Sequence, residues 1–138
     1  MLARYKLYRG PRAAGDPMPV GIRQDTRKHT SHCLRPSKQS VAEYISRPNN
    51  SAWRKFAADY LHTLKKRLNN DPAPFEILAQ LAREHDVFIG CSCPTKNIPD
   101  VERCHTVLAL SFMQEHFDIV IEFPHKGDSQ CDFVGNSS

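Results

Sequence analysis

The sequence predicts a small single α/β domain with three layers and a mostly parallel, Rossmann-like central sheet. Two stretches, residues 51–68 and 74–84, repeat apolar residues at helical spacing. Residues 87–90 (VFIG) form an unbroken apolar run, which is typical of a parallel strand covered on both faces. A helical pattern over 104–116 and a strand pattern over 118–123 follow. Strand, helix and strand then make a crossover unit, in which the two strands run parallel.

The composition is that of one folded domain. The chain has 138 residues, of which 40% are hydrophobic and 25% are charged, and its formal net charge is +4. No apolar stretch approaches the roughly 18 to 20 residues that a membrane span needs, and MLARYKLYRG lacks the apolar centre of a signal peptide. We therefore expect a cytoplasmic protein that does not bind membranes. The charge favours anionic partners only weakly.

The first part of the chain is predicted to contain two short strands and a basic loop. Residues 3–8 alternate loosely and end at the breaker Arg9-Gly10-Pro11. After a loop rich in proline and glycine, residues 20–25 (VGIRQD) form the second predicted strand. Residues 26–35 (TRKHTSHCLR) are too polar for a core element. They are expected to form an exposed loop that faces a ligand.

Three helices are expected before the central strand. Ser40 is predicted to cap a short helix that Arg47-Pro48 ends, with Glu43 completing a capping box. Ser51 is predicted to cap the long helix, which stops at the sequence NNDP. The third helix begins at Pro74, a residue that is well tolerated in a first turn.

Residues 118–123 are predicted to be the closing strand of the sheet, and they complete the domain. We expect residues 1–124 to form the α/β domain, because the apolar patterning ends at Pro124. Residues 125–138 are polar and have no hydrophobic period, so they are expected to form a mobile tail.

The stretch CSCPTKNIPDVERCH, residues 91–105, carries three of the five cysteines and one histidine. Cys91 and Cys93 follow the predicted central strand, and parallel sheets bind ligands at the carboxyl ends of their strands. If residues 20–25 form a neighbouring strand, Asp25 and Arg27 reach the same edge. In a reducing compartment such a cluster indicates a metal site or a reactive thiol.

Zinc is one interpretation of this cluster. Cys91, Cys93, Cys104 and His105 supply four candidate ligands of the types that zinc prefers. The C-x-C spacing and the adjacent Cys-His pair depart from the usual C-x2-C to C-x4-C knuckle. Zinc therefore stays the minority interpretation.

Thiol chemistry is the second interpretation, and simple packing is the third. Cys91 or Cys104, facing a helix N-terminus, would have a lowered pKa and act as a nucleophile, while Asp25 or His105 exchanges a proton. No phosphatase loop is present, since no arginine stands six positions after Cys91 or Cys93. In the third interpretation, the cysteines are small buried apolar residues.

Cationic side chains near the predicted sheet edge indicate recognition of phosphate. A solvated charged loop explains the same residues equally simply. The basic loop has no aromatic residue that could stack on a base, and no nucleic-acid-binding motif is present, so recognition of a nucleic acid lacks motif support. The candidate ligand-binding residues are Arg27, Lys28, His29, His32 and Arg103.

Several of these motifs together resemble domain-of-unknown-function family 488. The resemblance rests on Asp25-Thr26-Arg27, the helix that begins WRKF, the sequence CSCP and Arg103-Cys104-His105, and it extends from Arg4 to Pro124. Members commonly have an acidic residue at the place of Cys93 and an arginine at the place of Thr106. The resemblance implies a compact α/β domain and brings no established reaction.

Three functions follow from these alternatives. The first is an enzyme-like cleft that acts on a phosphate-bearing ligand such as a nucleotide, with Arg27 gripping the anion. The alternative is a zinc-stabilised, non-catalytic binding module for nucleic acid or an acidic protein. The third is an interaction domain whose cysteines only pack. If Asp25 and Arg27 share one pocket with the Cys104–His105 pair, the first two functions remain; if these residues are dispersed and buried, neither does.

Overall fold

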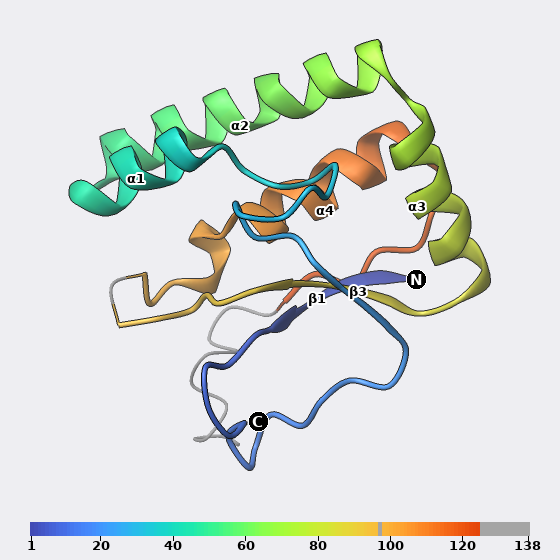
Figure 1. The fold of residues 1–138 in the computed structure, drawn as a ribbon, viewed down its shortest axis with the longest axis horizontal. Coiled ribbons are helices and arrows are strands. Elements are labelled where there is room, and N and C mark those ends of the chain that lie inside the picture. The colour runs from blue at the N-terminus through green and yellow to red at the C-terminus, as the bar shows by residue number, and fades with distance from the viewer. Residues whose placement is uncertain (97, 125–138) are drawn as a thin grey trace.

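The computed structural model describes residues 1–96 and 98–124, which form a parallel sheet and associated helices (Figure 1). This confirms the predicted mixed α/β class and the single small domain. Among the described residues, none of the helices combines the length and the apolar character that crossing a membrane requires. The predicted mobile tail, residues 125–138, lies outside the described residues. The elements are β1 (Leu2–Lys6), β2 (Ile22–Asp25), α1 (Lys38–Ser46), α2 (Asn50–Asn70), α3 (Ala73–Glu84), β3 (Val87–Cys91), the 3-10 helix η1 (Val101–Arg103) and α4 (His105–His116).

The sheet has the strand order β1-β3-β2, and β3 pairs in parallel with both neighbours. The apolar run at 87–90 was therefore correctly predicted to be the centre of the sheet. Leu2 and Ile22 both lie opposite Val87, so the three strands begin at the same level. Their carboxyl ends consequently meet at one edge.

The predicted closing strand, residues 118–123, forms only an isolated parallel bridge between Ile121 and Leu2. The Leu2 N–H donates to the carbonyl of Val120 at 2.8 Å, and the Glu122 N–H donates to the carbonyl of Leu2 at 2.9 Å. In this register the Arg4 N–H would donate next, to the Glu122 carbonyl, and residue 124 would be the donor after it. Pro124 has no N–H, so the ladder cannot continue there.

The helices α1, α2 and α4 lie on one side of the sheet, with α4 against β1 and β3 and with α2 packed on α4 (Figure 1). The segment 7–21 runs along the opposite side, where it approaches the other face of β3. The core lies between the sheet and α4. Its fully buried members include Leu2, Val87, Ile89, Leu110 and Met113.

The helices α1 and α2 both begin before the serine residues, Ser40 and Ser51, that the sequence predicts as their caps. The Ser37 hydroxyl caps α1 by accepting from the Ser40 N–H at 3.0 Å. The Asn49 side chain caps α2 by accepting from the Ala52 N–H at 2.8 Å. Serine and asparagine are comparable caps. The sequence offers two neighbouring cap residues in each case, and the structure uses the first of them.

A row of aromatic rings joins α1 to α2 and extends to α4. Phe56 stacks between Trp53 and Tyr60, with ring centroids 5.6 and 6.0 Å away. Tyr60 is almost fully buried, and its hydroxyl donates to the carbonyl of Leu34 at 2.5 Å. Its ring meets His105 edge-on at 5.7 Å. Tyr60 therefore fixes the basic loop and the first residue of α4 relative to each other.

We predict that Gly21→Ala destabilises the fold by roughly 1 to 3 kcal/mol. Gly21 has φ of 148°, a conformation that only glycine adopts readily, and a Cβ there would lie 2.6 Å from the Asp86 carbonyl oxygen. The measurement is the free energy of unfolding from urea titration. Gly10→Ala is the matched control, because a Cβ at Gly10 meets nothing within 4 Å. Equal stability of the two variants would contradict the prediction.

Candidate functional site

Three cysteines meet where β3 ends and α4 begins. Cys91 is the last residue of β3, Cys93 follows two positions later, and Cys104 is the N-cap residue of α4. Their three Sγ atoms all lie within 4.8 Å of one another. Cys91 and Cys104 are buried, Cys93 is partly exposed, and none of the three is in a disulfide. The cluster is thus a group of thiols assembled by the carboxyl edge of the sheet.

His105 is held between this cluster and the end of β2. Its Nε2 lies 3.0 Å from the Thr26 hydroxyl oxygen, and the Thr26 hydroxyl donates to the Gly90 carbonyl at 3.0 Å. A carbonyl can only accept, so the single proton of Thr26 goes to Gly90. The Nε2–H of His105 must therefore donate to Thr26. This leaves Nδ1, which lies 4.0 Å from Cys104 Sγ, as the nitrogen that exchanges a proton with the thiol.

The environment favours a charged Cys104–His105 pair. Burial alone would raise the pKa of the Cys104 thiol, but hydrogen bonding with Cys91, Cys93 and His105 lowers this pKa well below its usual value. Burial alone would lower the pKa of His105, but hydrogen bonding to Cys104 and Cys91 raises it to about 10. The positive end of α4 favours a thiolate at its N-cap as well. Both pKa shifts favour a thiolate paired with an imidazolium.

Cys93 behaves in the opposite way. Hydrogen bonding to Cys104 and Cys91, together with burial, raises the pKa of the Cys93 thiol. A protonated Cys93 can donate its S–H, whereas a thiolate can only accept. The hydrogen bonding between these two thiols thus raises the pKa of Cys93 and lowers that of Cys104.

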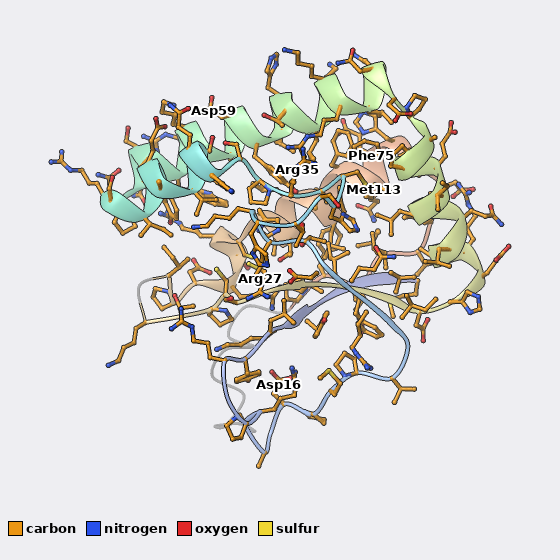
Figure 2. All side chains as sticks on the ribbon, in the orientation of Figure 1. Asp16, Arg27, Arg35, Asp59, Phe75 and Met113 are labelled. Atoms are coloured by element: carbon orange, nitrogen blue, oxygen red, sulfur yellow. The ribbon has the colours of Figure 1, made fainter. Side chains whose placement is uncertain are left out.

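A pocket of about 340 Å³ opens above the cluster. Cys91, Cys93, Cys104 and His105 all line it. Arg27, a further lining residue, lies between the sheet and the helices, on the side opposite Asp16 (Figure 2). The remaining cationic or ionisable lining residues are Arg9, Lys28, His29 and Arg103, and the apolar ones are Pro36, Val41, Tyr44, Ile45, Phe56 and Ile98.

The charges around the pocket are predominantly positive. No carboxylate is among the described residues that line it. Arg9, Lys28 and Arg103 have no ion-pair partner within the described part of the chain. Arg103 donates instead to the side-chain oxygen of Asn50. The pocket therefore presents cationic groups whose charge is not neutralised by the described residues.

Asp25 does not line the pocket itself, but it orients Arg27, which does. The Arg27 Nη2 donates to Asp25 Oδ2 at 2.8 Å and Nε donates to Oδ1 at 3.0 Å, a two-pronged pair. This hydrogen bonding with Arg27 lowers the pKa of the Asp25 carboxyl. His29 lies 3.7 Å from the same carboxylate. Nη1 of Arg27 takes no part in the hydrogen bonds to Asp25.

Most of the residues singled out from the sequence thus surround one pocket. Arg27, Lys28, His29 and Arg103 line it, and Asp25 is bonded to Arg27. His32 is not among the lining residues. Its Nδ1 accepts from the Leu34 N–H at 3.0 Å, and its Nε2 lies 2.6 Å from Gln24 Oε1. Both ring nitrogens of His32 are therefore engaged in holding the basic loop.

Three polar residues of the site have no separate signal in the sequence. Thr26 holds His105, and Thr106 donates to Cys104 Sγ at 3.1 Å. Arg4, on β1, donates to Thr106. Thr26 follows a predicted strand end directly, which is the only hint that the sequence offers. Arg4 and Thr106 come together only through the packing of α4 on β1.

One of three comparisons with known proteins finds a match, and it is to a protein family. The model of a protein family described as DUF488-N3a, active DUF488-N3 subclade, matches residues 8–117. None of the curated proteins compared, and none of the solved structures, matches the chain. The match covers β2, β3 and all the helices, including every thiol of the cluster.

We predict that acidification destabilises the protein through His32. Burial, together with the nearby charge of His105, lowers the pKa of His32 from 6.5 to about 4. Between these two pH values only the unfolded chain takes up the proton. His32 should therefore contribute on the order of 2 kcal/mol above pH 6.5 that is lost as the pH falls toward 4.

The measurement is the free energy of unfolding as a function of pH. His32→Asn keeps an acceptor near Nδ1 and does not titrate, so its stability should vary less across this window. A variant whose pH dependence matches that of the parent would show that another group is responsible.

Proposed function

The chain belongs to the domain-of-unknown-function 488 family, and we propose that its pocket binds a phosphate-bearing small molecule such as a nucleotide, to which Cys104 is presented as a nucleophile. One observation carries the proposal. A thiol–imidazole pair lines a pocket together with several cationic side chains. None of the described residues that line this pocket carries a carboxylate. Nucleophilic thiols are activated by such a base, and anions are recognised by such cations.

The cationic side chains would bind the anionic end of the ligand. Arg9, Lys28 and Arg103 have charges that the described residues leave unpaired, and Arg27 is held in one orientation by Asp25. A guanidinium fixed in this way forms directed hydrogen bonds to phosphate with little further loss of side-chain entropy. Asp25 acts as the residue that orients Arg27.

The apolar wall would bind the rest of the ligand. Val41, Tyr44 and Ile45 come from α1, and Phe56 comes from α2. Ligand sites commonly pair such a wall with a few placed polar groups, and a pocket of about 340 Å³ lies within their range. A molecule with an anionic group and a flat apolar part, such as a nucleotide, matches both halves.

The chemistry would be displacement at an electrophilic carbon of the ligand. The Cys104 thiolate forms a bond to this carbon, and the bond to the leaving group breaks with its electron pair. The leaving group takes the Nδ1 proton of His105. Water then returns a proton to Nδ1 while its oxygen displaces the thiolate, so the enzyme ends as it began.

Metal binding is a second candidate function, supported by the mutual proximity of the three thiols. Zn–S bonds of about 2.3 Å in a tetrahedral site place sulfur atoms roughly 3.8 Å apart. The present separations, all within 4.8 Å, need little closing. Cys91, Cys93 and Cys104 would hold zinc as thiolates, with a fourth position facing the pocket. A zinc-bound Cys104 would not be the free nucleophile of the first proposal.

We predict that Cys104 prefers a negatively charged alkylating agent. Iodoacetate and iodoacetamide have nearly the same size, so the ratio of their rates at one thiol measures the local potential. This ratio, followed for each cysteine by mass spectrometry of peptides, should be higher for Cys104 than for N-acetylcysteine. Arg103→Ala should lower the ratio by about fivefold, which corresponds to roughly 1 kcal/mol.

Lys66→Ala is the matched control, because it removes the same charge from an exposed position of α2 that does not line the pocket. Adenosine monophosphate should protect Cys104 from iodoacetamide, and adenosine, which lacks the phosphate, should protect it much less. A ratio equal to that of N-acetylcysteine, or equal protection by adenosine monophosphate and adenosine, would refute the proposed ligand class.

For the metal candidate, we predict about one equivalent of zinc in protein purified without an affinity tag, measured by elemental analysis. Cys93→Ser should lose the metal because it removes one of three ligands, and Cys33→Ser should retain it because Cys33 is not in the cluster. Less than about a tenth of an equivalent, with no change of melting temperature on adding a chelator, would rule out this function.

A further inference from the structure

The Thr106 hydroxyl makes a directed hydrogen bond to the proposed nucleophile. Its Oγ1 lies 3.1 Å from Cys104 Sγ and 2.9 Å from Nε of Arg4. An arginine N–H can only donate, so Thr106 accepts from Arg4. The one hydroxyl proton of Thr106 is then left for the sulfur. The direction of both hydrogen bonds follows from chemistry rather than from assumed proton positions.

Arg4 also holds the other arm of the thiol cluster. Its Nη2 donates to the carbonyl of Cys93 at 2.6 Å, while Nε donates to Thr106. One guanidinium therefore links the segment that follows β3 to the first turn of α4. The two arms that carry Cys93 and Cys104 are separated by ten residues of chain, and Arg4 reaches both from β1.

The charge of Arg4 complements that of Cys104. Arg4 forms no ion pair within the described residues, and its hydrogen bonds to Thr106 and Cys93 go to uncharged oxygens beside the thiols. Thr106 is fully buried, so water does not replace its hydroxyl as a donor. A buried hydroxyl that accepts from a cation is a stronger donor to a thiolate on its other side.

We propose that Arg4 and Thr106 are positioning residues for the Cys104 thiolate: Arg4 orients the Thr106 hydroxyl, and that hydroxyl holds the sulfur opposite Nδ1 of His105. The inference rests on the proposed function, in which Cys104 is the nucleophile. Neither residue contacts the ligand in this role. Cys104 Sγ is then held from two sides, by an imidazole and by a hydroxyl.

The test measures the rate of Cys104 alkylation by iodoacetamide as a function of pH, in chelator-treated protein, with each cysteine resolved by mass spectrometry. Thr106→Val removes the hydroxyl and keeps the shape of the side chain. It should move the midpoint of the rate profile upward by about one pH unit, the effect of one hydrogen bond to a charged group. Thr106→Ser keeps the donor and should restore the parent midpoint.

Arg4→Lys supplies an independent variant that keeps the charge but cannot make both hydrogen bonds. It should also move the midpoint of the rate profile upward, by a smaller amount than Thr106→Val. If Thr106→Val fails to fold, Arg4→Lys alone tests the positioning role. Thr63→Val is the control for losing a helical threonine hydroxyl, because the Thr63 hydroxyl donates to the carbonyl of Asp59, away from the thiol cluster. Its midpoint should equal that of the parent.

The outcomes separate this inference from the proposed function. If Cys104 of the parent reacts no faster at neutral pH than N-acetylcysteine, the proposed nucleophile is wrong. If Cys104 of the parent is reactive and the midpoints of folded Thr106→Val and Arg4→Lys equal that of the parent, the positioning role is wrong. A shift in Thr106→Val that Thr106→Ser does not reverse would also overturn it, since packing would then explain the effect.

Discussion

The hydrogen bonds of β3 to strands on both of its sides are the constraint on which the site depends. β3 pairs in parallel with β1 and β2, and the registers set Arg4 opposite Ile89 and Asp25 opposite Gly90. Three segments that are far apart in the sequence therefore end at one level, beside the N-terminus of α4. A slip of one residue in either pairing would turn every side chain of that strand to the other face of the sheet.

This arrangement favours charges of opposite sign on two adjacent buried residues, Cys104 and His105. Hydrogen bonding lowers the pKa of the Cys104 thiol and raises that of His105, which favours a thiolate paired with an imidazolium, and Arg4 adds a positive charge beside Thr106. A ligand bound in the pocket would contact the other cationic lining residues, Arg9, Lys28 and Arg103. A thiolate in an apolar environment would be costly without such partners. The same three sulfur atoms suit a soft metal ion equally well, so occupancy by metal and reactivity of the thiol are alternatives for one molecule.

Local patterns predicted the helices and the central strand, because periodicity and an unbroken apolar run depend only on neighbouring residues. The adjacency of Cys104 and His105 also pointed to the site directly. The contributions of Thr26, Thr106 and Arg4 could not be predicted, since each depends on which strand lies beside which helix. The bridge at Ile121 was overpredicted as a strand. The missing N–H of Pro124 is visible in the sequence, but its importance depends on a register that only the fold defines.

The row of aromatic rings places the fluorescent side chain of Trp53 next to rings that line the pocket. Trp53 is the single tryptophan of the chain, and its ring lies 5.6 Å from the rings of both Tyr44 and Phe56. Those two rings line the pocket. A molecule that enters the pocket therefore lies one ring away from the only indole fluorophore in the protein. The side chains next to the indole are therefore among those that would contact a ligand, so a bound molecule would change the surroundings of the fluorophore.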